Sequence, residues 1–555
     1  MRNAARDSIP MKSFPTLLLL LVTALPLALL SQSLESQFDA LMQAEWPADG
    51  PGATALVAVE GHIVYHKAFG QANLELEVPM RPEMVFEIAS ITKQFTAVAT
   101  LMLMEEGKLS LDDDLSKFLP DYPVGERTIT VHHLLNHTSG IKSYTSMEAW
   151  GNTWRQDKTP QEMVDLFQDE PVDFEPGEAY SYNNSAYFLL GMVIEAASGM
   201  TYEEFIEQEI FAPLGMDQSR YGSQSEIIAN RASGYQNNGE FQNTEYLSLT
   251  QPYAAGALMS TVEDLFTWNR AIRANTLVSG ETIAKAFTNH TLNNGESINY
   301  GYGWVIDEIY GSRTLEHSGG IFGYGTNAIY APEEDVFVAI FANCDCKNPT
   351  DISTRMAALA LDKAPPTAAD AVPVKAKYAK KLVGTYDYDD GTTRYVSYED
   401  GQLYSQRAGS TKLEIYADES GTFFFPGEFS TVTFDVSRKG VNAVFQYRIN
   451  KVNGHKTDRP VPVRKEVALT AAQLEHVVGV YALQPGVDVS FKVEDGQLKT
   501  QVTGQPWFDV FASDPLHFFL KVVEADIEFL EDASGRVHGM ILRQGGLEME
   551  AKRKG

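Results

Sequence analysis

A serine followed three residues later by a lysine could form a nucleophile and its base. Ser90 and Lys93 open a segment, residues 91–106, whose apolar side chains predict a helix buried on nearly every side. Because three residues make about one helical turn, the two side chains lie on one face of that helix. Burial at the helix N-terminus would lower the pKa of the lysine amine and let it take the serine proton. The spacing alone is weak evidence, because a chain of this length holds about one such pair by chance.

A second polar cluster precedes another apolar helix, predicted over residues 185–198. Tyr182 and Asn184 stand just before it, where polar residues are usually turn and cap residues. The functional alternative is a Tyr–Asn pair that lines a cleft. A phenol can relay a proton when a cation lowers its pKa, and an amide can hold an amide-bearing substrate.

A glycine-rich segment, residues 317–320 (His-Ser-Gly-Gly), leads into a hairpin predicted over 326–330 and 336–343. Glycines in a strand indicate that something approaches the backbone closely. A substrate lying along this strand would need that room, and a free backbone N–H there could stabilise an oxyanion.

Metal and disulfide chemistry are not expected. His133 and His137 are four residues apart, but no Asp, Glu or Cys at a matching spacing completes a metal site. Cys344 and Cys346 are the only cysteines, and a bridge between residues so close would be strained. We therefore expect structural roles for all four residues and no metal or organic cofactor.

The net charge and the N-terminal sequence restrict the possible partners and location of the protein. The net charge of −30 argues against nucleic acid and anionic membrane surfaces as partners. Basic residues precede an apolar run, residues 17–30, which predicts a signal peptide over 1–33. An uncleaved N-terminal anchor is the alternative. We expect an exported protein, periplasmic or extracellular, without stable membrane insertion after cleavage.

The C-terminal part of the chain contains an internal repeat. Gly384, Glu399 and Arg448 each recur 95 residues later, and other pairs share that offset without a gap. Each copy holds short alternating runs between turns, the pattern of a small antiparallel barrel. The predicted organisation is a first domain over 34–362, a Pro/Ala linker over 363–376, and two accessory barrels over 377–465 and 466–555.

Taken together, residues 34 to about 360 resemble the serine β-lactamase/penicillin-binding protein family. The resemblance rests on Ser90-Ile-Thr-Lys93, Tyr182-Asn-Asn184 and His317-Ser318-Gly319, in that order. It implies an α+β fold, with an antiparallel sheet flanked by helices and an all-helical part. It also implies that Ser90 is acylated and that Lys93 and Tyr182 share the acid–base work. Asn184, His317, Ser318, Gly319 and Gly320 would contact the substrate, and the N–H groups of Ser90 and Gly320 would form an oxyanion hole.

One position departs from the family pattern. His317 stands where the lactamase and transpeptidase members have a lysine that helps bind a substrate carboxylate. His-x-Gly resembles the D-aminopeptidase and esterase-like members instead, and the two barrels agree with that architecture by analogy. We expect an exported serine hydrolase that acts on D-amino-acid peptides or small esters. The alternatives are a D-Ala-D-Ala carboxypeptidase, a β-lactamase, or a catalytically idle scaffold. The expected partner is a small-molecule or peptide substrate.

Overall fold

The computed structural model describes residues 33–461, 466–484, 487–494, 496–503, 505–521, 525–544 and 547–554. The expected signal peptide lies outside these ranges except for Ser33 and stays a prediction, as does export. None of the helices within these ranges combines the length and apolarity that a membrane span requires.

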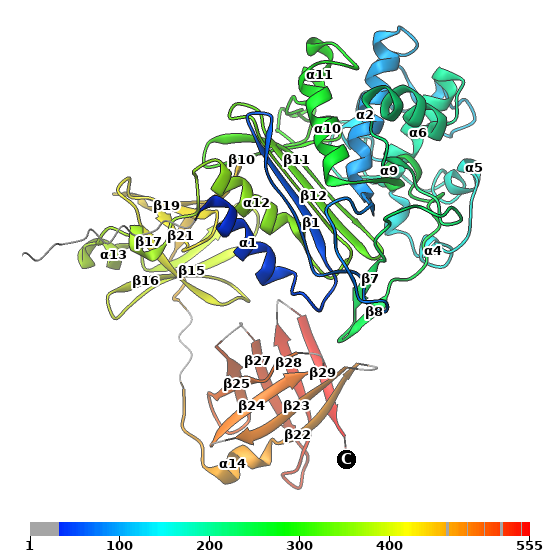
Figure 1. Cartoon of the computed structure of the whole chain (residues 1–555). Coiled ribbons are helices and arrows are strands. Elements are labelled where there is room, and N and C mark those ends of the chain that lie inside the picture. Colours follow the sequence, from blue (N-terminus) through cyan, green and yellow to red (C-terminus); the bar gives the residue numbers. More distant parts are fainter. Residues whose placement is uncertain are drawn as a thin grey trace, which may run out of the picture.

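A six-stranded antiparallel sheet forms the centre of the first domain, in the order β10-β11-β12-β13-β1-β2 (Figure 1). The strands are β1 (Ala53–Val59), β2 (His62–Phe69), β10 (Val305–Ile309), β11 (Ser312–Ile321), β12 (Tyr324–Ala331) and β13 (Val336–Ala342). Side chains alternate between its faces, so Ala55 and Val57 pack in a cluster with α1 (Leu34–Glu45) and α12 (Pro349–Ala360). Leu56 and Ala58 pack on the opposite side. Both faces are covered, so β1, β12 and β13 are buried almost throughout, and β1 and β13 are almost entirely apolar.

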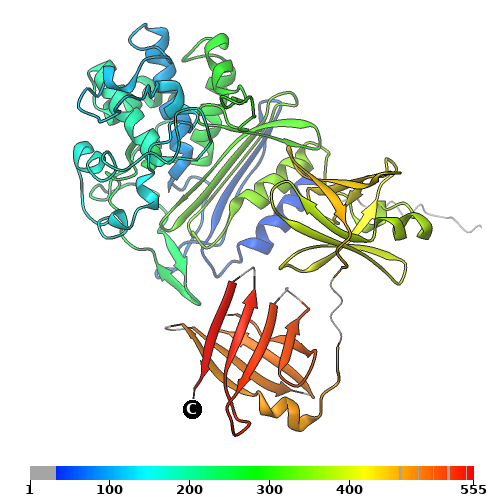
Figure 2. The same cartoon turned by 180° about the vertical axis from the view of Figure 1, so that it is seen from behind.

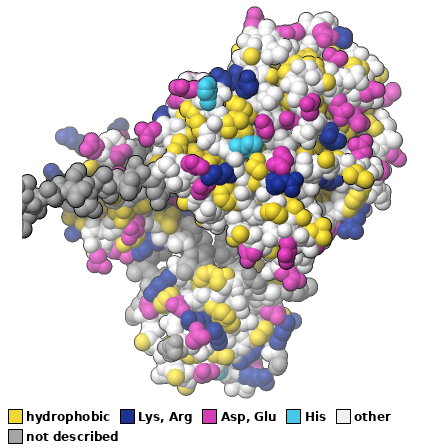
Figure 3. Space-filling view, in the orientation of Figure 1, with side chains coloured by type: hydrophobic (Ala, Val, Ile, Leu, Met, Phe, Trp, Pro, Cys, Tyr) yellow, Lys and Arg dark blue, Asp and Glu magenta, His cyan; other side chains and the backbone are white. Residues whose placement is uncertain are grey.

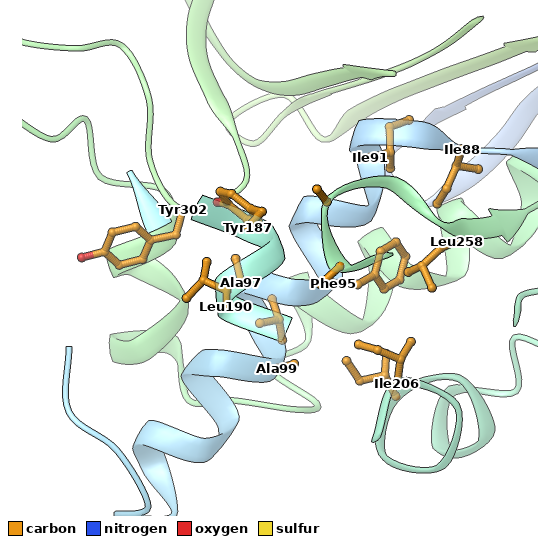
Figure 4. Packing of buried hydrophobic residues seen from close by; sticks show 14 of the residues in the cluster. Ile88, Ile91, Phe95, Ala97, Ala99, Tyr187, Leu190, Ile206, Leu258 and Tyr302 are labelled. Atoms are coloured by element: carbon orange, nitrogen blue, oxygen red, sulfur yellow. The ribbon is translucent and has the colours of Figure 1, made fainter. Parts of the chain in front are cut away.

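The helix predicted from residue 91 is α2 (Thr92–Glu105), and it runs through the centre of the helical part. It packs against α6 (Asn184–Ser198) and the short α9 (Tyr253–Gly256). Phe95 stacks on Trp268 with the ring centroids 4.2 Å apart. Figure 4 shows Phe95, Ala97 and Ala99 of α2 among buried apolar neighbours. The segment that follows Ser90 is therefore anchored in the core.

The repeat forms two closed eight-stranded antiparallel barrels, as predicted. The first consists of β14 (Gly384–Tyr388), β15 (Thr393–Glu399), β16 (Gln402–Arg407), β17 (Lys412–Ala417), β18 (Phe423–Phe424), β19 (Ser430–Ser437), β20 (Gly440–Tyr447) and β21 (Asn450–Thr457). The second consists of β22 (Gly479–Gln484), β23 (Val487–Glu494), β24 (Gln497–Val502), β25 (Phe508–Ala512), β26 (His517–Leu520), β27 (Ala525–Glu531), β28 (Val537–Gln544) and β29 (Leu547–Arg553). A buried tyrosine recurs in each copy. Tyr386 donates to Leu382 O at 2.7 Å, and Tyr481 donates to Val477 O at 2.9 Å.

The first barrel is joined to the first domain by a buried arginine. This barrel lies beside α12 and β10 in both views of the molecule (Figures 1 and 2). Arg448, in the turn between β20 and β21, is only 5% exposed. Its guanidinium makes two hydrogen bonds to the Glu316 carboxylate, at 2.8 and 3.1 Å, and one to Thr314 Oγ1 at 3.0 Å. Its Nε donates to Glu308 O at 2.9 Å. The first barrel therefore also stabilises the first domain, because one of its residues completes a buried ion pair of the sheet. Its accessory role stays a prediction.

Replacing Arg448 should destabilise the protein. In Arg448→Ala the Glu316 carboxylate would stay buried without its partner, which typically costs about 3–5 kcal/mol. Arg543 occupies the equivalent place in the second repeat but binds Glu528 and Glu548 at the surface. Arg543→Ala is therefore the matched control. Thermal unfolding should show a clearly lower Tm for the first variant and little change for the second. Equal Tm values for both variants would contradict the role given to Arg448.

Candidate active site

Ser90 lies in a tight turn, η1 (Ala89–Ile91), between β5 (Phe86–Glu87) and α2. Ala89 has φ +49°, a left-handed conformation that costs free energy for any residue other than glycine. The turn is held by its surroundings. Ile88 N donates to Leu258 O at 2.9 Å, and Thr326 Oγ1 donates to Ile88 O at 3.0 Å. Packing thus fixes a strained backbone that presents the Ser90 side chain.

Lys93 is fully buried, and its amine is within hydrogen-bonding distance of three oxygens. Nζ lies 3.0 Å from Ser90 Oγ, 2.8 Å from Asn184 Oδ1 and 2.7 Å from Ala255 O. No carboxylate pairs with Lys93 in the described part of the chain. Burial therefore lowers the pKa of Lys93 well below its usual value. A neutral amine has two N–H donors and one lone pair, and the two carbonyl oxygens can only accept. In the neutral form of Lys93, the lone pair would therefore face the Ser90 hydroxyl.

The aromatic ring of Tyr182 packs against the Lys93 amine. Its ring centroid is 4.8 Å from Lys93 Nζ, and the residue is 38% exposed. Burial of its hydroxyl raises the pKa of Tyr182, and a hydrogen bond with Ser90 lowers it by less. The phenol therefore keeps its proton. This arrangement suits Tyr182 to donate a proton beside Ser90, while Lys93 accepts one.

Asn184 connects the lysine to the opposite wall of the site. Its carbonyl oxygen accepts from Lys93, and its Nδ2 donates to Thr145 Oγ1 at 3.2 Å. Its backbone N–H donates to Ser143 Oγ at 3.3 Å. Neither Ser143 nor Thr145 belongs to a motif that the sequence singled out. Only the fold shows that this loop holds Asn184.

His317 is buried behind the site rather than along its wall. It is 3% exposed, with Nε2 at 3.0 Å from the Tyr300 hydroxyl and Nδ1 at 2.6 Å from Ser318 O. Burial lowers the pKa of His317 to about 3, and the Lys93 amine adds to this shift only when it is protonated. It therefore stays neutral at ordinary pH.

His133 and His137, the two histidines considered for a metal site, make structural hydrogen bonds. His133 Nδ1 accepts from Thr130 N at 3.2 Å and so caps α3 (Val131–Leu135). His137 Nδ1 accepts from Asn183 N at 3.0 Å, and its ring lies 4.4 Å from that of Tyr182. No potential metal-binding group of three or more His, Cys, Asp and Glu side chains occurs in the described ranges. His137 instead supports Tyr182 from behind, a role that the sequence did not indicate.

The two glycines of β11 have different surroundings. A Cβ on Gly319 would lie 2.4 Å from Ile88 O and 2.3 Å from Thr326 Oγ1, so glycine lets the strand approach the Ser90 turn. A Cβ on Gly320 would meet nothing within 4 Å. Gly320 and the exposed Ser318 lie on the open side of the same strand.

A pocket of about 290 Å³ opens over Ser90. Asn184 and Gly320 also line it, whereas Lys93, Tyr182 and His317 do not. Its other lining residues are mostly apolar: Ala89, Tyr144, Thr145, Trp150, Leu247, Pro252, Ala255, Gly256, Ile321, Phe322 and Asp345. Asp345 is the only charged residue in this lining, and no Lys or Arg contributes to it. An uncharged or positively charged substrate fits this wall better than an anionic one.

The expectation of two unbridged cysteines is wrong. Cys344 and Cys346 form a disulfide, with their Cα atoms 5.1 Å apart. That separation lies within the ordinary range for a disulfide, because the chain bends directly after β13. The bridge encloses Asp345, the charged residue of the pocket.

A strained serine turn, a buried lysine of lowered pKa one turn later, and a Tyr-x-Asn segment near both define a serine hydrolase of the penicillin-recognising type. Residues 36–363 match the model of the family described as "Beta-lactamase", and the chain belongs to that family. Residues 463–554 match a domain of unknown function, DUF3471.

The chain is similar to several known proteins. "Penicillin-binding protein 4*" of Bacillus subtilis is 32% identical over 71% of this chain and 92% of its own length. A "D-aminopeptidase" of Gluconobacter oxydans is 24% identical over 56% of this chain and 59% of its own length. The octameric penicillin-binding protein homologue from Pyrococcus abyssi is 29% identical, with a TM-score of 0.53 over 76% of this chain and 99% of that one.

The neighbouring glycines of β11 provide a test of the site geometry. Gly319→Ala should push β11 away from the Ser90 turn, at a cost of about 1–3 kcal/mol, because its contacts include the Ile88 backbone. Gly320→Ala places the same methyl group in open space and should leave the Tm unchanged. Thermal unfolding of both variants measures the difference. A Gly319→Ala protein as stable as the wild type would show that the strand and the turn are not in tight contact.

Proposed function

We propose that this serine hydrolase forms an acyl-enzyme on Ser90 and cleaves amides or esters of D-amino acids. The observation that carries the proposal is the Lys93 amine, buried without a counter-charge and 3.0 Å from Ser90 Oγ. A neutral amine in this position can take the hydroxyl proton as the oxygen attacks. The similarity to a D-aminopeptidase supports the D-amino-acid substrate class.

In the proposed reaction, Ser90 Oγ bonds to the substrate carbonyl carbon while its proton passes to Lys93 Nζ. The backbone N–H groups of Ser90 and Gly320 would stabilise the oxyanion. Tyr182 gives its proton to the leaving amine or alkoxide as the C–N or C–O bond breaks, and Lys93 returns a proton to Tyr182. Water then attacks the acyl-Ser90 ester and loses its proton to Lys93. As the ester C–O bond breaks, Lys93 gives that proton to Ser90 Oγ, which releases the acid and restores both residues.

The pocket chemistry favours this reading over a carboxylate-dependent one. His317 is neutral and directed at Tyr300, so it offers no cation to a substrate carboxylate. The second candidate, a D-Ala-D-Ala carboxypeptidase or β-lactamase, is supported by the similarity to penicillin-binding protein 4*. Those substrates carry a free carboxylate, and the lining of this pocket contains no Lys or Arg to bind it.

Acylation is best tested by intact-protein mass spectrometry with p-nitrophenyl acetate and a penicillin. The ester should add an acetyl group to the wild type and nothing to Ser90→Ala. Lys93→Met keeps a long side chain without a base and should slow acylation by about 10²–10⁴-fold. Lys142→Met, at the surface lysine that pairs with Asp173, is the control. Rapid acylation of Lys93→Met would require a different base. Faster labelling by penicillin than by the ester would bring the second candidate to the front.

The preference between these probes should not change with pH. Burial lowers the pKa of His317 to about 3, so the imidazole stays neutral from pH 8 down to about pH 4. The ratio of acylation rates for the ester and the penicillin should therefore be the same at pH 8 and pH 5. A shift toward penicillin with a midpoint near pH 6.5 would mean that His317 becomes charged and binds the carboxylate.

A further inference from the structure

We infer that Asp345 is a specificity-determining residue that binds the ammonium group of the substrate. This inference rests on the proposed function, since it takes Ser90 as the reacting group. The observation is a single carboxylate in the wall of a small and otherwise uncharged pocket. Ser90 and Asp345 line the same cavity of about 290 Å³. In the inferred complex, one small substrate contacts both.

The position of Asp345 is fixed from two sides. Its neighbours Cys344 and Cys346 are joined by the disulfide, so the backbone of Asp345 is closed in a short ring. Its Oδ2 accepts a hydrogen bond from Gly323 N at 3.0 Å, in the turn between β11 and β12. Its backbone N–H donates to Tyr235 O at 3.2 Å. A carboxylate held in this way loses little conformational entropy when it binds a ligand.

Asp345 still has acceptor capacity for a ligand. A carboxylate has two oxygens with about four lone-pair directions, and one contact to Gly323 leaves most of them free. Asp345 is exposed, and no ion pair joins it to any cation of the described ranges. The nearest basic residue in sequence, Lys347, binds Glu45 at 3.1 Å instead. An incoming ammonium group would therefore meet an uncompensated negative charge.

The rest of the pocket indicates what else the substrate carries. Trp150, Ile321 and Phe322 provide apolar wall near Asp345 and Gly320. An α-amino acid residue with an apolar or aromatic side chain satisfies these conditions. Its carbonyl carbon faces Ser90, its side chain contacts the apolar wall, and its free amino group binds Asp345. A substrate whose amino group is acylated would lose the charged contact.

The electrostatic field of the whole protein also favours a substrate with a positive charge. The chain carries a net charge of −30, and Asp and Glu side chains are spread over the face drawn in Figure 3, interspersed with Lys and Arg. Such a field attracts cationic substrates and repels anionic ones. The local carboxylate then selects the end of the molecule that carries the charge.

The test compares two substrates that differ only in this charge, D-phenylalanine methyl ester and N-acetyl-D-phenylalanine methyl ester. The wild type should prefer the free amine. Asp345→Asn keeps the size of the side chain and removes its charge. We expect it to lower kcat/KM for the free amine by about 10- to 100-fold, the usual loss for a hydrogen bond to a charged group. Hydrolysis of the acetylated ester should change by less than about twofold. Asp121→Asn, at an exposed carboxylate outside the pocket lining, is the control and should change neither.

Acylation by p-nitrophenyl acetate, which has no amino group, separates the two levels of the proposal. If the wild type and Asp345→Asn are acylated alike but show no difference between the two methyl esters, the role of Asp345 is refuted and the hydrolase assignment stands. An equal loss on both esters would make Asp345 merely structural. If the wild type is acylated by none of the three esters, the proposed function itself fails.

Discussion

The architecture of the first domain depends on burying one amine without a counter-charge. Lys93 has no carboxylate partner, so the protein must satisfy it with neutral oxygens from three separate segments. Ser90 comes from the preceding turn, Asn184 from the start of α6, and Ala255 from α9. Each of these elements must place its oxygen within hydrogen-bonding distance of Lys93 Nζ. The helical packing around α2 and the strained Ala89 turn are the means by which the fold meets this condition.

This constraint explains which parts of the site could be predicted from sequence. Ser90 and Lys93 are three residues apart, so helical geometry alone brings them together. Tyr182 and Asn184 were recognisable as a motif, but their distance from Lys93 is a tertiary property. Thr145 and His137 contact the site through loops whose sequences carry no pattern. The roles assigned to the motif residues remain proposals, whereas their convergence on Ser90 is now described.

The α+β fold of the first domain followed from the family resemblance and the two barrels from periodic patterns. The departures arose where non-local contacts decide. Alternation along the repeated strands predicted two barrels, because each strand shows one face to its own core. Nothing in that pattern indicated that Arg448 would leave its barrel and bind Glu316 across the domain boundary. The Cys344–Cys346 bridge was missed for a similar reason. Its Cα separation depends on the bend after β13, which local spacing does not determine.

The buried arginine constrains the sequence of the first repeated barrel more than that of the second. In the first copy, the turn that holds Arg448 packs against the hydrolase domain, so insertions or deletions there would break the buried ion pair with Glu316. In the second copy, Arg543 is satisfied by carboxylates of its own barrel. No described hydrogen bond or ion pair joins Arg543 to the catalytic domain. The same position of the repeat thus links the first barrel to the enzyme and stabilises only the local fold in the second.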